Sequence, residues 1–199
     1  MQPPGREGRV KDDPLTTMDS MANAIAAAIR PLLTTSYAFF GHSMGAVIAY
    51  EVIRMLRASG AAWPTHLFVS ASGAPHVPDL DRHHLLGDDE LIATLRKEGG
   101  FPEEILGNRD FMEMLFPVIR ADAAVTETYR HQRGTTFECP MTAFIGTRDE
   151  KIRADDIRAW KSYTNKAFRE VTVDGAHDFI KTATNDITTV VAAELATAR

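Results

Sequence analysis

A short apolar run meets a helical segment across a turn that contains two glycines and a serine. Residues 37–40 (YAFF) are apolar and aromatic, as in a buried strand, and residues 46–58 have the composition of a helix. The turn between them reads GHSMG, and Gly41 and Gly45 have no Cβ to obstruct neighbouring backbone. The pattern predicts a sharp strand-to-helix turn that projects Ser43 above the edge of a sheet.

The rest of the chain alternates strands with helices. Further buried strands are predicted at residues 66–70, 141–145 and 169–173, and helices at residues 19–33, 155–163 and 178–198. We expect Thr16, with Asp19 three positions later, to cap the first helix. The alternation predicts an α/β fold, a parallel sheet with helices on both faces.

Residues 76–136 interrupt this alternation. They contain helical stretches at residues 88–97 and 110–129 but no convincing strand. An all-helical insertion between two strands of such a sheet is typical of a lid over an active site, and helical decoration is the alternative. We therefore expect a single domain, residues 1–199, with a helical lid insertion at about 76–136.

Composition excludes several classes of function. The net charge of −5 is spread without a basic run, which argues against nucleic acid as a partner. No apolar run approaches the roughly 18 residues of a membrane span, and the first residues lack the apolar core of a secretory signal. The single cysteine, Cys139, suits a packing role in a reducing cytoplasm. We expect a cytoplasmic globular protein.

The turn at residues 41–45 matches the G-x-S-x-G pattern of serine hydrolases. A serine at the N-terminus of a helix lies where the helix dipole favours developing negative charge. The sequence predicts Ser43 as a nucleophile and the backbone N–H of Met44 as an oxyanion donor. A plain glycine-rich turn is the structural alternative.

A nucleophilic serine needs a histidine base and a carboxylate that orients it, in the chain order Ser, Asp or Glu, His. His177 follows the last predicted strand, and Asp149 follows the one before it, so both lie at the sheet edge where Ser43 is expected. Glu150 is a rival for the acid, whereas Asp174 comes early in its turn.

The remaining histidines suggest no further site. His42 adjoins the serine, but adjacent residues on a tight turn are expected to point apart. A group of possible metal ligands in the insertion lacks regular spacing, so we expect no metal there: His76, Asp79, Asp81, His83 and His84. No phosphate-binding glycine loop indicates a cofactor.

Beyond these motifs, the chain resembles the type II thioesterases that accompany non-ribosomal peptide and polyketide synthetases. The segments that carry the likeness are PGRE, YAFFGHSMGA, DDELIATLRKEGG, IRADAAVTETYR, CPMTAFIGTRDE, DIRAWKSYT and DGAHDFI. The resemblance implies an α/β-hydrolase fold and places the triad on Ser43, Asp149 and His177. It also implies a lid over a tunnel for the acyl chain and the phosphopantetheine arm of a carrier protein, and an editing activity that removes aberrant or stalled acyl groups.

The chain departs from the family pattern at two points. Ala176 and Arg148 stand where relatives usually have a glycine and an acidic residue. Relatives also begin about fifty residues earlier, with two more strands and a loop resembling F-P-H-A-G-G that supplies a second oxyanion donor. We therefore expect the fold to lack its first strands, through truncation or a start codon assigned too late. Loss of one donor typically lowers the rate about a hundred- to a thousandfold.

Three functions remain open from the sequence. The first is an editing thioesterase that acts on acyl-carrier thioesters through an acyl-Ser43 intermediate. The second is a general carboxylesterase of the same fold. The third is a catalytically impaired fragment that still binds a carrier protein.

Overall fold

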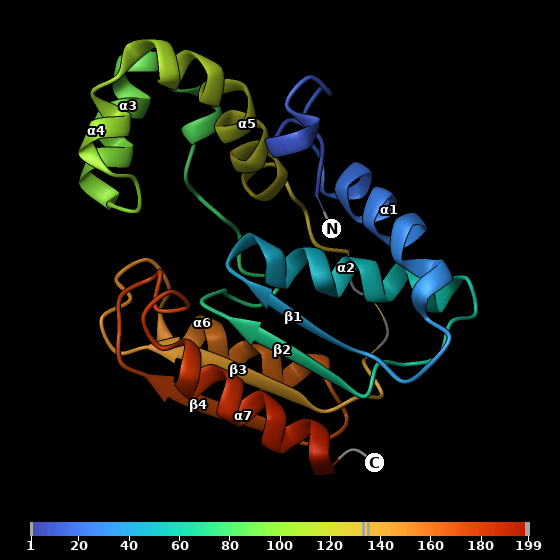
Figure 1. The fold of residues 1–199 in the computed structure, drawn as a ribbon. Coiled ribbons are helices and arrows are strands. Elements are labelled where there is room, and N and C mark those ends of the chain that lie inside the picture. The colour runs from blue at the N-terminus through green and yellow to red at the C-terminus, as the bar shows by residue number, and fades with distance from the viewer. Residues whose placement is uncertain (1, 133, 135, 198–199) are drawn as a thin grey trace. The chain divides into compact units, whose positions relative to one another are not determined.

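The computed structural model describes residues 2–132, 134 and 136–197 of the chain (Figure 1). Its strands are β1 (Ala38–His42), β2 (His66–Ser70), β3 (Met141–Gly146) and β4 (Phe168–Val173). Its α-helices are α1 (Met18–Ile29), α2 (Met44–Ala58), α3 (Asp88–Glu98), α4 (Glu103–Leu106), α5 (Arg109–Glu127), α6 (Ala154–Arg158) and α7 (Thr184–Thr197). Short 3₁₀ turns are η1 (Glu7–Arg9), η2 (Arg30–Leu32), η3 (His83–Leu85) and η4 (Ala159–Tyr163).

The chain divides into two compact units. A helical unit comprises Met1–Met21 and Pro78–Tyr129, and an α/β unit comprises Ala22–Val77 and Arg130–Arg199. The helical unit thus contains most of the segment in which we expected a lid. Its role as a lid stays a prediction.

The α/β unit is built on a parallel sheet in the order β1-β2-β3-β4, which confirms the predicted α/β architecture. All four strands were predicted within two residues of their bounds, and β2 was predicted to the residue. Because the strands are parallel and in register, their carboxyl ends lie along one edge: His42 pairs with Ser70, and Ser70 pairs with Phe144. This edge is where the predicted site residues were expected.

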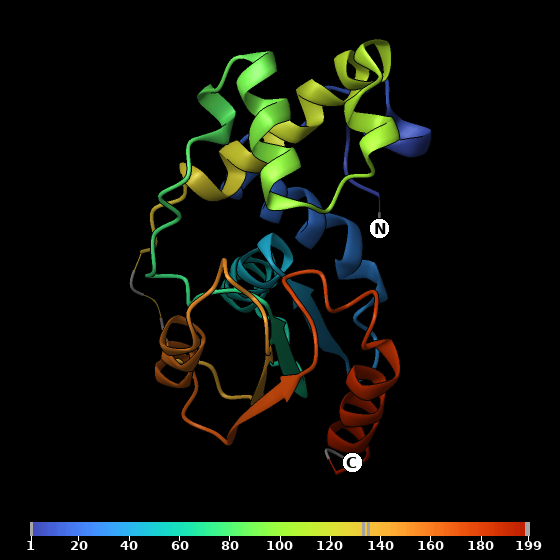
Figure 2. The same ribbon diagram turned by 90° about the vertical axis from the view of Figure 1, so that its left-hand side faces the viewer.

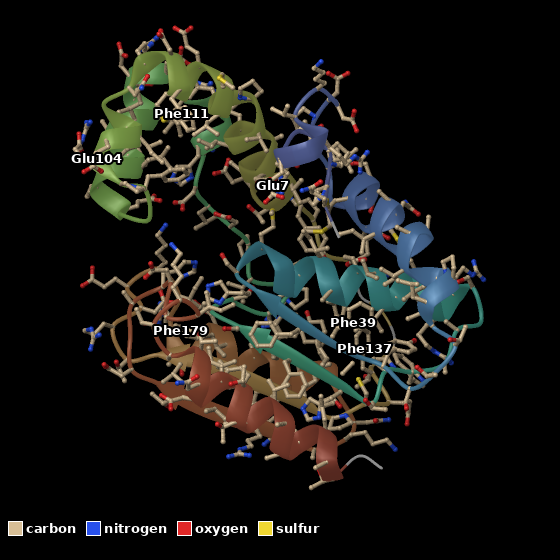
Figure 3. The ribbon with its side chains drawn as sticks, viewed as in Figure 1. Glu7, Phe39, Glu104, Phe111, Phe137 and Phe179 are labelled. Carbon is tan, nitrogen blue, oxygen red and sulfur yellow. The ribbon has the colours of Figure 1, made fainter. Side chains whose placement is uncertain are left out.

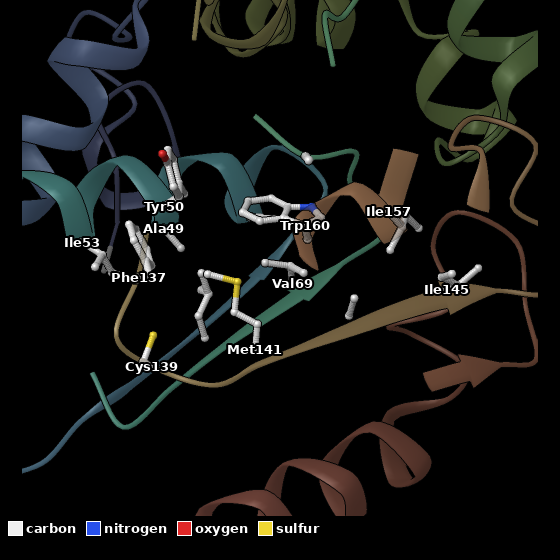
Figure 4. Close-up of a cluster of buried hydrophobic side chains, with 14 residues drawn as sticks. Ala49, Tyr50, Ile53, Val69, Phe137, Cys139, Met141, Ile145, Ile157 and Trp160 are labelled. Carbon is white, nitrogen blue, oxygen red and sulfur yellow. The ribbon is translucent and has the colours of Figure 1, made fainter. Parts of the chain in front are cut away.

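Two apolar clusters cover the faces of this sheet, because successive side chains of a strand point to opposite sides. Leu67 and Val69 of β2 belong to the first cluster, which includes Tyr50 of α2 and Trp160 of η4 (Figure 4). Phe68, between them in β2, belongs to the second cluster, to which α7 contributes. Helices α2 and α6 therefore cover one face of the sheet and α7 the other (Figure 2).

Cys139 is 1% exposed in the first cluster, which confirms its packing role. Burial raises the pKa of its thiol to about 12, so it stays a protonated, unreactive thiol near neutral pH. Trp160, fully buried in the same cluster, donates its indole N–H to the carbonyl of Ser72 at 2.9 Å.

The helical unit has its own small core. Buried side chains from α3, α4 and α5 form it: Leu91, Leu95, Leu106, Met112 and Phe116. Asn108 caps α5, because its side-chain oxygen accepts a hydrogen bond from the N–H of Phe111 at 3.1 Å. The short helix α4 was not predicted from the sequence.

Several predicted helix boundaries were wrong. The cap of α1 is Thr17 rather than Thr16, since the hydroxyl of Thr17 accepts from the N–H of Ser20 at 3.2 Å, and the helix ends at Ile29 instead of residue 33. The last helix begins at Thr184, not at residue 178. The intervening residues form turns around Phe179, whose buried ring fixes the loop against the sheet (Figure 3). The predicted end at residue 198 lies outside the described residues.

A search of the described residues finds no helix that is both long and apolar enough to cross a bilayer.

Candidate active site

Ser43 occupies the turn between β1 and α2 in a strained backbone conformation. Its φ is 53° and its ψ is −126°, a region that residues other than glycine rarely enter. The backbone N–H of Ser43 donates to the carbonyl of Ser70 at 2.8 Å, and its carbonyl accepts from the N–H of Ala46 at 2.9 Å. These bonds to the neighbouring strand and to the first turn of α2 hold the serine in place.

Only one of the two motif glycines has the steric role that the sequence suggested. A Cβ on Gly41 would stand 2.3 Å from the carbonyl oxygen of Gly45 and 2.5 Å from the Cα of Ala46. A Cβ on Gly45 would meet nothing within 4 Å. Among the described residues, Gly41 is thus required by the crossing of β1 and α2, and the steric argument for Gly45 is wrong.

The three predicted residues form a continuous hydrogen-bonded chain in the α/β unit. Nε2 of His177 lies 3.0 Å from Oγ of Ser43, and Nδ1 of His177 lies 3.0 Å from Oδ2 of Asp149. The side chain of Asp149 is fully buried, whereas that of His177 is 24% exposed. This is the geometry in which an imidazole can take a proton from a serine while a carboxylate orients it.

Asp149 remains ionised although it is buried. Burial raises the pKa of its carboxyl, but hydrogen bonds outweigh that effect and hold the pKa below the usual range. The donors are the ring of His177 and the backbone N–H groups of Lys151 and Ile152, which reach Oδ1 at 2.9 and 3.2 Å. One carboxylate oxygen is therefore fixed by the loop and the other is left for the imidazole.

Backbone hydrogen bonds join the loop after β3 to the loop after β4. The N–H of Arg148 donates to the carbonyl of Gly175 at 2.9 Å, and the N–H of Thr147 donates to the carbonyl of Val173 at 2.9 Å. Gly146 permits the approach, because a Cβ there would stand 2.7 Å from the carbonyl oxygen of Gly175. The loops that carry Asp149 and His177 are thus positioned by direct backbone contacts.

The rival acids lie elsewhere. Glu150 is exposed, and Asp174 is an exposed residue bound to the hydroxyl of Thr147 and the guanidinium of Arg148. Their hydrogen bonds lower the pKa of Asp174, with Thr147 contributing most. Arg148, noted as unusual in the sequence, therefore neutralises a carboxylate in the next loop.

Sequence reasoning missed His42. The last residue of β1 was expected to point away from Ser43 and to have no part in the site, but its ring centroid lies 5.7 Å from that of His177. Its Nδ1 lies 2.9 Å from the hydroxyl of Ser70. The one available signal was its position at the carboxyl end of a strand, the edge on which the site was expected.

Met44, the predicted oxyanion donor, is the first residue of α2. The N–H groups of the first helical turn have no acceptor within the helix, so this one can donate to an anion above Ser43. Its role stays a prediction.

Two histidines of the insertion, His83 and His84, bind carboxylates. Nδ1 of His83 lies 2.7 Å from Glu127, and its Nε2 lies 2.8 Å from Glu98. Within the described residues, Asp81, His83 and Glu98 form one group whose ligand atoms lie within 4.8 Å of one another, so these three could hold a metal ion. His76, by contrast, bonds the hydroxyl of Tyr163 in the α/β unit at 2.9 Å.

Comparison with known proteins identifies relatives of this chain. The thioesterase domain family matches residues 1–194. The chain is 38% identical over 181 residues to the gramicidin S biosynthesis protein GrsT of Aneurinibacillus migulanus, covering 90% of this chain and 71% of that protein. It is 33% identical over 199 residues to the linear gramicidin dehydrogenase LgrE of Brevibacillus parabrevis, covering 98% of this chain and 76% of that protein.

Solved structures that are similar to this chain are also thioesterases. RedJ, a thioesterase of the prodiginine pathway in Streptomyces coelicolor, is 36% identical with a TM-score of 0.91, over 98% of this chain and 78% of RedJ. YbtT, a type II thioesterase of the yersiniabactin pathway, is 26% identical with a TM-score of 0.90, over all of this chain and 81% of YbtT. With its α/β-hydrolase architecture and its serine turn, the chain belongs to the thioesterase family.

Proposed function

We propose that this chain is a type II thioesterase that hydrolyses aberrant or stalled acyl groups from the phosphopantetheine arm of carrier proteins in non-ribosomal peptide and polyketide biosynthesis. The observation that carries the proposal is the chain of hydrogen bonds from Ser43 through His177 to Asp149. YbtT, which is named as a type II thioesterase of a combined non-ribosomal peptide and polyketide pathway, supports the substrate class.

In the first half of the reaction, Nε2 of His177 accepts the proton of Ser43 while Oγ attacks the thioester carbonyl. The carbonyl oxygen becomes an oxyanion, to which the N–H of Met44 donates. When the tetrahedral intermediate collapses, the carbon–sulfur bond breaks. His177 then gives its proton to the departing thiolate, which leaves as the thiol of the carrier arm.

In the second half, water replaces the thiol. His177 takes a proton from the water while the water oxygen attacks the carbonyl carbon of the acyl-Ser43 ester. Collapse of the second intermediate returns the proton to Oγ of Ser43 and releases the acyl group as a free acid. Throughout, ionised Asp149 keeps Nδ1 of His177 protonated and stabilises the imidazolium.

The proposed activity requires a carrier protein as partner, and we place it in the cytoplasm. The substrate is presented by an acyl or peptidyl carrier protein, and the reaction takes place in the cytoplasm. We assign to the helical insertion at about residues 76–136, which lies in the chain between β2 and β3, the role of the lid that admits the acyl chain.

The test begins with a fluorophosphonate probe and the intact mass of the protein, for the wild-type chain and for Ser43→Ala. We expect one adduct on the wild type and none on the variant. Initial rates are then compared for an acyl-phosphopantetheinyl carrier protein and for the p-nitrophenyl ester of the same acyl group.

A strong preference for the carrier-bound thioester supports the proposal. Equal or faster ester hydrolysis would instead identify a general carboxylesterase. A folded wild-type chain without an adduct would mean an impaired site, and the proposed activity would then be wrong for this polypeptide.

A further inference from the structure

His42 connects three parts of the α/β unit at the edge of the sheet. It is the half-buried last residue of β1, and its ring contacts Ser70 at the end of β2. The same ring lies beside His177 and Phe179, which belong to the loop between β4 and α7. His42 is therefore the side chain through which the strand of the nucleophile meets the loop of the base.

A hydrogen bond ties His42 to the residue that holds the nucleophile turn. Ser70 is 1% exposed, and its hydroxyl lies 2.9 Å from Nδ1 of His42, while its carbonyl accepts the N–H of Ser43 at 2.8 Å. In a neutral imidazole, Nδ1 can accept from the hydroxyl of Ser70. The ring of His42 is thus anchored to the same residue that anchors Ser43.

Packing fixes the plane of this ring. Its centroid lies 5.4 Å from that of Phe179 in an edge-to-face arrangement with an interplanar angle of 84°. Phe179 is fully buried. The centroids of His42 and His177 lie 5.7 Å apart with an angle of 50°. The ring of His42 is thus packed against both Phe179 and His177.

The charge state of His42 matters to its neighbour. Burial lowers the pKa of His42, and the ring of His177 lowers it further, against the opposing effects of the His177 backbone, Asp149 and Asp178. The net pKa is below the usual range, so His42 is neutral at neutral pH. A second cation beside His177 would disfavour the imidazolium that forms during catalysis.

We propose that His42 is a positioning residue: its ring, hydrogen-bonded to Ser70 and packed against His177 and Phe179, holds the base at bonding distance from Ser43. The inference rests on the proposed function only in taking His177 as the base. It predicts that removing the hydrogen bond of His42 slows the chemical step and leaves substrate binding unchanged.

Two substitutions separate hydrogen bonding from packing. His42→Phe keeps an aromatic ring without nitrogen atoms. His42→Gln keeps a side-chain oxygen that can accept a hydrogen bond from Ser70. The matched control is His66→Gln, since His66 is a histidine 2% exposed at the opposite end of β2, bound to the hydroxyl of Thr142 at 2.9 Å.

For each protein, the measurements are kcat and KM on an acyl thioester, the labelling rate of Ser43 by a fluorophosphonate, and the melting temperature. We expect His42→Phe to lower both kcat and the labelling rate roughly tenfold to a hundredfold with KM unchanged. His42→Gln should recover most of this loss. His66→Gln should lower the melting temperature and leave kcat unchanged.

Wild-type kcat in His42→Phe would overturn the inference, as would a glutamine variant no better than the phenylalanine variant. If the wild type is labelled at Ser43 but does not cleave carrier-bound acyl groups, the proposed function fails, and the labelling rates still test His42. Nitrogen NMR of the histidine rings, assigned with His42→Gln, should show a neutral Nε2–H tautomer for His42 at pH 7. A doubly protonated ring would contradict the inference.

Discussion

The carbonyl oxygen of Gly45 lies 2.3 Å from the point where a Cβ on Gly41 would stand. The last part of β1 and the first turn of α2 therefore touch through backbone alone, and this contact gives the turn at Ser43 its sharpness. The second motif glycine has open space around its own Cβ position among the described residues. The two glycines should respond differently to the same substitution.

Gly41→Ala should destabilise the protein by about 3 kcal/mol or more, because its methyl group would overlap backbone that has no room to move. Gly45→Ala is the matched control. At this helical position alanine is favoured over glycine by up to about 1 kcal/mol, so stability should be unchanged or increased. Urea unfolding followed by circular dichroism measures both variants. An unchanged midpoint for Gly41→Ala would show that the backbone contact is looser than described.

Asp149→Asn should reduce kcat by on the order of ten-thousandfold, because an amide can hold His177 in the wrong tautomer. Glu150→Gln, one residue further along, removes a charge from an exposed side chain and should have little effect. Steady-state rates on one acyl thioester compare the two. Loss of activity in the Glu150 variant, with Asp149→Asn active, would reverse the assignment of the acid.

Ser43→Gly should be more stable than Ser43→Ala by about 1 kcal/mol, since glycine relieves the strain at a φ of 53°. Both variants lack the nucleophile and should be inactive. Melting temperatures, taken with the wild type, show how much stability the serine conformation costs. Equal stability of the two variants would mean that this backbone conformation is not strained.

The helical unit should be stabilised most strongly in mildly acidic solution. Burial alone would lower the pKa of His83, but hydrogen bonds to Glu127 and Glu98 raise it above its ordinary value of 6.5. Burial raises the pKa of Glu127, but bonds from His84 and His83 bring it below its ordinary value of 4.5. The histidine contribution is complete below 6.5 and declines as pH rises through the folded-state pKa. The glutamate contribution is complete above 4.5 and declines in acid.

The difference in melting temperature between the wild type and His83→Gln should therefore be largest between about pH 4.5 and 6.5 and should shrink above that range. A double-mutant cycle supplies the control. In a Glu127→Gln background, His83→Gln should lose most of this pH dependence. A wild-type advantage that grows toward pH 8 would show that His83 folds as the neutral ring.

The sheet and the three hydrogen-bonded side chains could be predicted because both follow from local pattern and one geometric rule. Short apolar strands separated by helices indicate a parallel sheet, and parallel strands end at one edge. Ser43, Asp149 and His177 each follow a different predicted strand, so their meeting required no knowledge of packing. Glu150 remained a rival for the predicted acid Asp149, and in the structure it is Asp149 that is hydrogen-bonded to His177.

What could not be predicted depends on contacts between distant residues. Residues 178–183 have a composition compatible with a helix, but the burial of Phe179 keeps them in turns and delays α7 until Thr184. His42 was set aside because its partners are distant in the sequence: Ser70 ends β2, and His177 lies in the loop after β4. Neither contact can be predicted from the local spacing of apolar residues.

The spatial order of the strands is also their order along the chain, β1-β2-β3-β4. A ribosome therefore delivers these four described strands one after another to the growing edge of the sheet, and none of the four has to be inserted between two that are already paired. Ser43 is made before Asp149, and His177 follows β4. A nascent chain thus carries Ser43 without its base until the residues after β4 have been made, and His177 cannot activate the nucleophile before then.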